Sequence, residues 1–154
     1  MKRSVGAGAL GAAIIMCAGA IATTAMAADD PITARKTMMK NVNAATGVLV
    51  RMAKAEIEFN AISAELALRV INTASQGYGE LFPDGSEDGG QTEFRAGPAI
   101  WSNRDGFNTE IAKLQNASAE ALVNPPTTQE EVGPALNSVG QVCSSCHEGF
   151  RLKN

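Results

Sequence analysis

The residues Cys143-Ser144-Ser145-Cys146-His147, close to the end of the 154-residue chain, decide both its fold and its chemistry. Two cysteines separated by two residues and followed at once by histidine are typical of a c-type haem attachment site. Each thiol adds to a vinyl group of the porphyrin, and the adjacent imidazole binds the iron as its proximal ligand. On a helix, Cys143 lies three positions before Cys146 and four before His147, so the three side chains share one face. We therefore predict one haem c, attached through Cys143 and Cys146, with His147 as an iron ligand.

Other kinds of site can contain the same five residues. A zinc site needs about four thiolate or imidazole ligands, but the only further cysteine is Cys17 and His147 is the sole histidine. A thioredoxin-like dithiol belongs in a βαβ unit, and no strand pattern surrounds the motif. A plain disulfide between Cys143 and Cys146, with the histidine adjacent by chance, is the remaining alternative. Haem attachment is favoured because the one histidine falls where haem chemistry requires it.

The N-terminal segment has the pattern of a secretory signal peptide. Two basic residues precede a mostly small and apolar run at positions 5–22, and Ala25-Met26-Ala27 matches a cleavage site. A retained membrane anchor is the alternative, but much of the run is glycine and alanine. We expect cleavage to remove residues 1–27, with Cys17, and to leave residues 28–154 as one domain. Export fits the haem motif, because c-type haem is attached outside the bacterial inner membrane, and it predicts a periplasmic protein.

The composition of the mature chain excludes some classes of partner. Loss of Lys2 and Arg3 takes the basic residues from 13 to 11 against 16 acidic ones, a formal charge of −5. A modestly acidic chain is poorly suited to nucleic acid and has no basic amphipathic face for membranes, so we expect neither nucleic acid nor stable membrane insertion. Aromatic residues make up only 5% of the sequence. This scarcity suits closely packed helices around a porphyrin that supplies apolar volume.

Apolar spacing and capping residues predict four helices and no strand. The first begins at Asp29-Asp30-Pro31 and the second follows Asn60. The third starts at Pro98, and the fourth follows Thr127 or Thr128, with Glu130 or Glu131 completing a capping box. A long loop over residues 83–94 separates the second helix from the third. Helices of this length predict an antiparallel four-helix bundle, with the haem in its core near the C-terminal helix.

The expected inward positions recur at helical spacing within each of the four segments. In chain order they are Ile32, Met39, Val42, Leu49, Ala53 and Ile57, then Ile62, Leu66, Val70 (or Ile71) and Leu81, then Trp101, Phe107, Ile111, Leu114 and Leu122, and last Val132, Leu136, Val139 and Phe150. Trp101 and Phe107 are expected in the bundle core, near the edge of the porphyrin. Met52 is expected to fill the core.

From end to end, the mature chain resembles the cytochrome c' family, which includes low-spin c-556-type members. A haem motif at the C-terminus of an exported four-helix chain is unusual among small c-type cytochromes. The matching segments, in order, are Arg35-Lys36-x-x-Met39-Lys40, Leu81-Phe82-Pro83, Ala99-Ile100-Trp101, Phe107-Asn108-Thr109-Glu110-Ile111 and Cys143-x-x-Cys146-His147-x-x-Phe150-Arg151. Many high-spin relatives form dimers through their first two helices, so the resemblance also implies a homodimer as one expected assembly.

The resemblance implies roles for three residues outside the haem motif. Arg35 matches a first-helix arginine that contacts a haem propionate, with a solvated helix charge as the alternative. Arg151 matches the basic residue beside the proximal face of the haem. Met39 matches the position that faces the distal side, where low-spin members have a methionine ligand and high-spin members an apolar side chain that blocks the site. We predict Met39 as the sixth iron ligand, ahead of Met38, which points about 100° away, with ordinary core packing as the alternative.

The iron ligands decide between two functions. A second histidine is absent from the sequence, so the iron is bound either by His147 and Met39 or by His147 alone. A thioether as sixth ligand suits outer-sphere electron transfer, whereas a five-coordinate iron admits nitric oxide or carbon monoxide. We predict a single-electron carrier with redox proteins as donor and acceptor, and the alternative is a gas-binding protein that sequesters nitric oxide. No enzymatic activity is expected, because a peroxidase would want a distal acid–base group.

Overall fold

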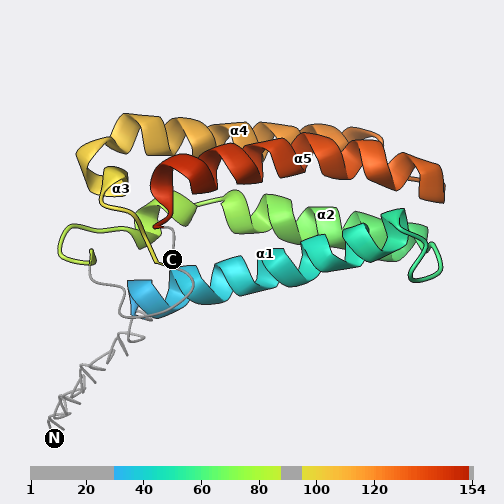
Figure 1. Cartoon of the computed structure of the whole chain (residues 1–154), viewed down its shortest axis with the longest axis horizontal. Helices are drawn as coiled ribbons and strands as arrows, with labels where there is room; N and C mark the ends of the chain where they lie inside the picture. Colours follow the sequence, from blue (N-terminus) through green and yellow to red (C-terminus); the bar gives the residue numbers. More distant parts are fainter. Residues whose placement is uncertain (1–29, 88–94, 153–154) are drawn as a thin grey trace, which may run out of the picture.

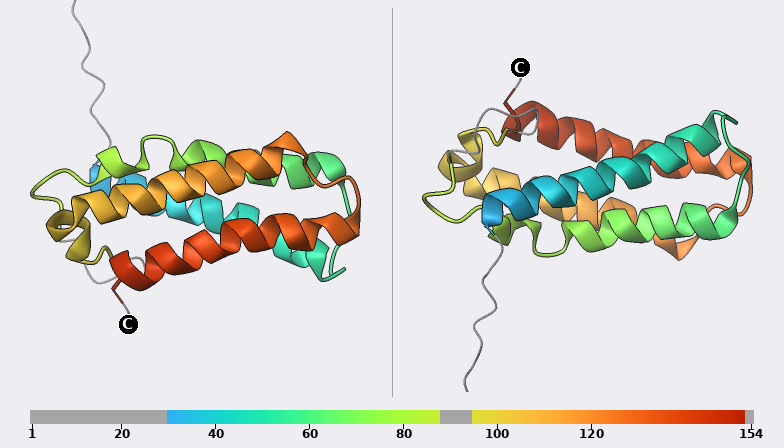
Figure 2. Two further views of the ribbon diagram at one scale, coloured as in Figure 1. Left: turned by 90° about the horizontal axis from the view of Figure 1, so that it is seen from above. Right: turned by 90° about the horizontal axis from the view of Figure 1, so that it is seen from below.

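Four long helices run side by side, each antiparallel to the one before it in the bundle (Figure 1). A computed structural model describes residues 30–87 and 95–152. The helices are α1 (Pro31–Ala53), α2 (Ala61–Ser75), α4 (Arg104–Val123) and α5 (Gln129–Phe150). Both α1 and α4 pack against α2 and α5, so each helix has two neighbours (Figure 2). The predicted all-α antiparallel four-helix bundle is confirmed.

Capping residues fix the starts of three helices where the sequence predicts them. The Asp30 carboxylate accepts hydrogen bonds from the backbone N–H groups of Ile32 (3.3 Å) and Thr33 (3.1 Å) at the start of α1. The Asn60 side chain accepts one from Ser63 N–H (2.8 Å) at the start of α2. Thr128 is the N-cap residue of α5. These bonds satisfy N–H groups that have no partner within the helix.

The helix ends differ from the prediction in two places. The apolar spacing predicts that the first helix continues to Ile57, but α1 ends at Ala53 and the chain turns through Ala55, which has a φ of 56°. The segment predicted as the third helix forms two helices, the short α3 (Ala99–Ser102) and the long α4, with one residue between them. Asn103 separates them, and its side chain accepts a hydrogen bond from Gly106 N–H (3.2 Å) as the cap of α4. A local cap therefore interrupts a continuous apolar pattern.

The predicted inward stripe of α2 is wrong at three positions. Ile62, Leu66 and Val70 are 71%, 56% and 40% exposed. The residues that α2 buries are Ala64, Ala67, Leu68, Ile71, Ala74 and Ser75. Of the predicted positions in this helix, only the alternative, Ile71, faces the core. The helix is apolar on two faces, and its small-residue face packs inward.

The core consists of two clusters of buried residues. The larger lies within the four long helices and includes Leu49, Met52, Leu68, Ile71, Val132 and Val139. The smaller is aromatic and contains Phe82, Ile100 and Phe107, close to the 3-10 helix η1 (Tyr78–Leu81). The expected core roles of Met52 and Phe107 are confirmed, since these residues are only 2% exposed.

Some predictions fall on parts of the chain that the structure does not describe. The predicted signal peptide, residues 1–27, and positions 88–94 of the predicted loop lie outside the described residues. Within residues 30–87 and 95–152, no helix has both the length and the apolar character needed to cross a lipid bilayer.

Candidate functional site

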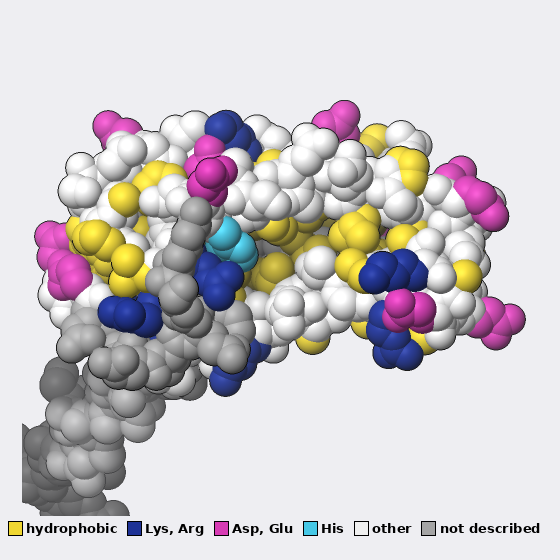
Figure 3. Space-filling view, in the orientation of Figure 1, with side chains coloured by type: hydrophobic (Ala, Val, Ile, Leu, Met, Phe, Trp, Pro, Cys, Tyr) yellow, Lys and Arg dark blue, Asp and Glu magenta, His cyan; other side chains and the backbone are white. Residues whose placement is uncertain are grey.

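A cavity of about 340 Å³ lies at the end of the bundle where α1 begins and α5 ends. Its walls come from the first half of α1, the residues around η1, the start of α4 and the last turns of α5. Apolar and aromatic side chains dominate, and hydrophobic side chains line the furrow between α1 and α5, beside the histidine (Figure 3). The lining residues with a full charge are four cations and one acid, namely Arg35, Lys36, Arg95, Arg151 and Glu110.

The haem motif lies on α5, where the two apolar clusters meet. Cys143 packs against the larger cluster and Cys146 against the aromatic one. Cys143, Cys146 and His147 all line the cavity. The helix therefore directs both thiols and the imidazole to one space, as their spacing predicts.

Both thiols are free, so the alternative of a disulfide between them is not realised in this structure. Burial raises the pKa of the Cys143 thiol, and burial together with the charges of Glu110 and Cys143 raises the pKa of Cys146 to about 11. His147 is exposed at the rim of the cavity, and partial desolvation together with the charge of Arg151 lowers its pKa. A lowered pKa favours the neutral imidazole, which is the form that binds metal ions.

Met39 lies on α1, whereas the haem motif is on α5. It is half-buried on α1 and lines the same cavity as His147, which α5 contributes. Met38 packs against the larger core cluster but is not among the lining residues. The structure thus brings the predicted proximal and distal residues to one cavity, while ligation of iron by Met39 stays a prediction.

Arg35 is a buried cation, only 4% exposed, on the same wall of the cavity. Its Nη1 donates to the carbonyl oxygen of Leu81 (3.4 Å) and to Ser86 Oγ (3.1 Å), and its Nη2 donates to Ser86 O (2.7 Å). Its guanidinium carbon lies 4.7 Å from the ring centroid of Phe82 and 5.7 Å from that of Trp101. Burial lowers the pKa of Arg35, but a guanidinium stays charged at neutral pH. The alternative of a solvated helix charge is therefore wrong.

Aromatic rings close the end of the cavity. The Phe82 and Phe107 ring centroids are 4.9 Å apart, and those of Phe107 and Phe150 are 5.4 Å apart. All three rings line the cavity, together with Tyr78, which packs edge-on against Phe82. Trp101 lies behind Phe82 and donates from Nε1 to the carbonyl of Pro83 (3.2 Å). Rings in such offset and edge-on contacts form a rigid apolar wall, which suits the flat face of a porphyrin.

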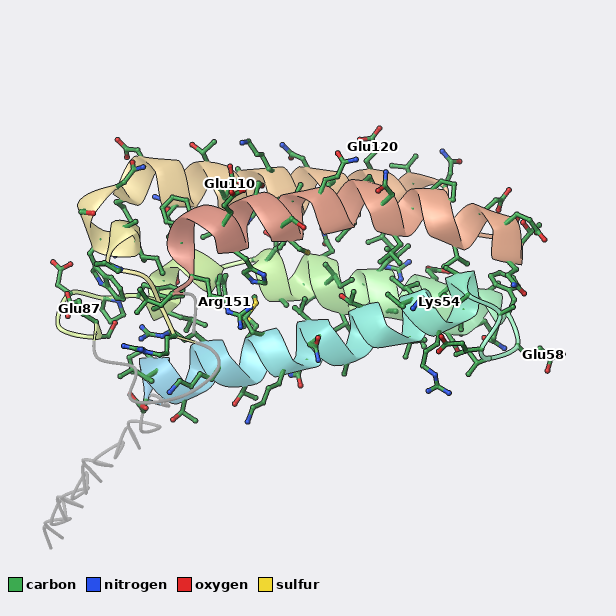
Figure 4. All side chains as sticks on the ribbon, in the orientation of Figure 1. Lys54, Glu58, Glu87, Glu110, Glu120 and Arg151 are labelled. Atoms are coloured by element: carbon green, nitrogen blue, oxygen red, sulfur yellow. The ribbon has the colours of Figure 1, made fainter. Side chains whose placement is uncertain are left out.

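Sequence reasoning did not find the backbone bridge that holds the end of α5. Gly97 N–H donates to Phe150 O (2.8 Å), and Leu152 N–H donates to Arg95 O (3.1 Å), around an isolated antiparallel bridge between Ala96 and Arg151. The bridge joins two segments that lie 55 residues apart and carries Arg95 and Arg151 to the cavity rim. Figure 4 shows Arg151 at this end of the bundle, between α5 and α1. No periodic pattern marks such a contact.

The site's residues fit a covalently attached porphyrin. Two free thiols and one imidazole face a cavity with apolar and aromatic walls, and cations stand at its edge for the anionic propionates. The described residues include no group of three or more histidine, cysteine, aspartate or glutamate side chains placed to hold a metal ion by themselves. An iron held by the porphyrin would fit these residues, with His147 and Met39 as its candidate ligands from this chain.

Comparison with known proteins gives the same assignment. The family profile described as Cytochrome C' matches residues 30–151. A cytochrome c-556 of Agrobacterium fabrum is 36% identical over 138 residues, which cover 90% of this chain and 88% of the relative. A solved cytochrome c' from Rhodopseudomonas palustris superposes with a TM-score of 0.75 at 31% identity, covering 82% of this chain and 99% of that one. Another solved cytochrome c', described as having ligand-controlled dimer dissociation, has a TM-score of 0.70 at 26% identity and covers 80% of this chain and 95% of its own.

Proposed function

The chain belongs to the cytochrome c' family of monohaem c-type cytochromes, and we propose that it is a single-electron carrier whose iron is bound by His147 and Met39. Its cofactor is one haem c. When bound, the haem supplies an iron that exchanges one electron between its ferric and ferrous forms. The polypeptide would hold the porphyrin and supply ligands to its iron.

One observation carries the proposal: Met39 and His147 line a single cavity from two different helices, α1 and α5. Cys143 and Cys146 would attach the porphyrin by thioether bonds, and His147 would bind the iron from the same helix. Met39 would bind the iron from α1. A thioether ligand raises the reduction potential, and an iron that keeps the same protein ligands in both charge states needs little rearrangement when it gains or loses an electron. This arrangement favours electron transfer over ligand binding.

Arg35 would neutralise a haem propionate from inside the protein. Three of its hydrogen bonds reach Leu81 and Ser86, and a guanidinium has five N–H donors. Its remaining donors include the Nε–H and one Nη2–H, on a side chain that lines the cavity. Arginine pairs with carboxylates through such adjacent N–H groups. Arg151, exposed at the rim beside the haem motif, would lie on the proximal side.

The predicted export implies a periplasmic protein whose electron donor and acceptor are other redox proteins. A homodimer is the assembly that the surface of α2 favours, because Ile62, Leu66 and Val70 form an exposed apolar stripe. The solved cytochrome c' with ligand-controlled dimer dissociation supports the same assembly here. Burial of this stripe against a second copy would remove apolar surface from water.

Substitution of Met39 tests the carrier proposal against gas binding. We expect the purified wild-type holoprotein to have a low-spin optical spectrum that does not change with carbon monoxide. Met39→Ala should convert it to a high-spin spectrum that responds to the gas, with the haem still attached. Met38→Ala is the matched control, since Met38 is on the same helix but packs against the core. A wild-type spectrum that is high-spin and shifts with carbon monoxide would refute the carrier proposal and favour nitric-oxide binding.

A further inference from the structure

Glu110 is the one aspartate or glutamate among the described residues that line the cavity. It comes from α4, whereas the haem motif is on α5. Its side chain is only 12% exposed. Such a position sets it apart from the acids on the outer surface of α4, such as Glu120, which is exposed and points away from the bundle (Figure 4).

Both carboxylate oxygens of Glu110 have partners. Oε2 accepts a hydrogen bond from Ser145 Oγ (2.5 Å), and Oε1 accepts one from Lys113 Nζ (2.6 Å). These two bonds, the Lys113 bond first, lower the pKa of Glu110, so the carboxylate is ionised at neutral pH. Lys113 is itself 54% exposed, so its own charge is more strongly screened by water than that of Glu110.

Ser145 lies between the two cysteines of the haem motif, so its hydrogen bond to Glu110 links the motif directly to a charged side chain. The bond fastens the attachment turn of α5 to α4 over a separation of 35 residues. A negative charge is therefore held at a fixed place beside the turn that bears Cys146 and His147. The surrounding cavity has mostly apolar walls, where charges act over longer distances than in water.

We infer that Glu110 is a positioning residue for the haem turn and that its fixed negative charge lowers the reduction potential of the iron. The ferric form carries one more positive charge than the ferrous form, so a nearby carboxylate stabilises it preferentially. Lys113, as the paired cation, acts in the opposite sense. This inference rests on the proposed attachment of haem at Cys143 and Cys146, and it holds for either state of the sixth ligand position.

The test is a spectroelectrochemical titration of the purified holoprotein and its variants. Glu110→Gln keeps the size of the side chain and an oxygen that accepts from Ser145, but it removes the charge. We expect its midpoint potential to be more positive, with the ferrous-to-ferric ratio at a fixed potential raised about threefold or more, as for the loss of one partly screened charge. Glu120→Gln is the matched control on the same helix and should leave the potential unchanged.

Two further variants separate charge from structure. Lys113→Gln should move the midpoint potential in the negative direction, opposite to Glu110→Gln, which a purely structural role of the pair would not produce. Ser145→Ala keeps the charge, so it should shift the potential less than Glu110→Gln does, while lowering the yield of attached haem. Attached haem with equal potentials in the wild type, Glu110→Gln and Lys113→Gln would overturn this inference alone. Failure of the wild type to bind haem would instead overturn the proposed function.

Discussion

Gly97→Ala should destabilise the haem end of the bundle far more than its small size suggests. A Cβ at position 97 would lie 2.9 Å from the carbonyl oxygen of Phe150 and 3.1 Å from its carbonyl carbon. Both are backbone atoms of α5, which no side-chain rotation can move away. The 95–97 segment must shift instead, and this strains the hydrogen bonds from Gly97 N–H (2.8 Å) and from Leu152 N–H (3.1 Å).

The expected loss follows from these two effects. Overpacking typically costs about 1–3 kcal/mol, and each backbone hydrogen bond contributes about 1 kcal/mol. We therefore expect Gly97→Ala to lower the free energy of unfolding by about 2–4 kcal/mol, measured by urea denaturation of the holoprotein with circular dichroism. Gly140→Ala is the matched control, because a Cβ there meets nothing within 4 Å. Removal of a glycine from the interior of α5 should instead stabilise the protein by about 0.5–1 kcal/mol. Equal midpoints and equal denaturant slopes for Gly97→Ala and the wild type would refute the reasoning.

Three further predictions test the N-terminal cap of α5, the hydrogen bonds of Arg35 to Leu81 and Ser86, and the exposed apolar stripe of α2. Glu131→Gln should flatten the acid limb of the curve of unfolding free energy against pH. Hydrogen bonds from Thr127 and Thr128 lower the pKa of Glu131 below its usual 4.5. The stabilisation by Glu131 is therefore present above about pH 4.5 and is lost as the pH falls through the folded-state pKa. An acid limb identical to that of the wild type would contradict this. Arg35→Lys should cost about 1–3 kcal/mol of unfolding free energy, since an ammonium cannot reproduce the planar fork that holds Leu81 and Ser86. Arg69→Lys, at an exposed position, is the control in the same urea titration. Equal losses of unfolding free energy in the two variants would argue against a stabilising role for the Arg35 hydrogen bonds. Leu66→Glu should shift sedimentation toward the monomer with unfolding free energy nearly unchanged, whereas an unaltered dimer would exclude this face of α2.

The parts of the fold that the sequence predicts correctly depend on neighbours a few residues apart. Asp30, Asn60 and Thr128 each start a helix where the sequence predicts it, because a capping side chain acts on N–H groups two or three positions later. The haem motif is equally local, so its three residues meet in the cavity as predicted. Such signals need no knowledge of the tertiary structure.

The error in α2 has a different physical cause. Ile62, Leu66 and Val70 recur at helical spacing, but so do Ala64, Leu68 and Ile71 on another face of the same helix. Periodicity shows that a helix has an apolar face, and it cannot choose between two such faces. Close packing against α1 and α4 favours the face with small residues, which lets the helix axes approach. Ile62, Leu66 and Val70 remain outside, where a second chain can cover them.

Two of the polar contacts that sequence reasoning missed, those of Arg35 and the Ala96–Arg151 bridge, lie at the haem end of the molecule, and this follows from the cavity itself. An end that must leave room for a porphyrin cannot be closed by apolar side chains packed to full density. Before the haem is attached, this end depends on other contacts between the helices. Arg35 hydrogen-bonds to Leu81 and Ser86 and so holds the segment 81–86 against α1. The Ala96–Arg151 bridge holds the end of α5 against the segment 95–97.

Attachment of the haem should therefore stabilise this end more than the other. Cys143 already packs against the larger core cluster and Cys146 against the aromatic cluster, so two thioether bonds to one rigid porphyrin would join the two clusters. Hydrogen exchange gives the measurement: amides of the last turns of α5 and of segment 95–97 should gain protection when the haem is bound. Amides of the opposite end, around Ala61 and Thr128, should change little, because Asn60 and Glu131 already cap those helices without the cofactor. Equal gains in amide protection at both ends would mean that the bundle folds as one unit around the haem. The Arg35 hydrogen bonds and the Ala96–Arg151 bridge would then not hold the cavity open before the haem is attached.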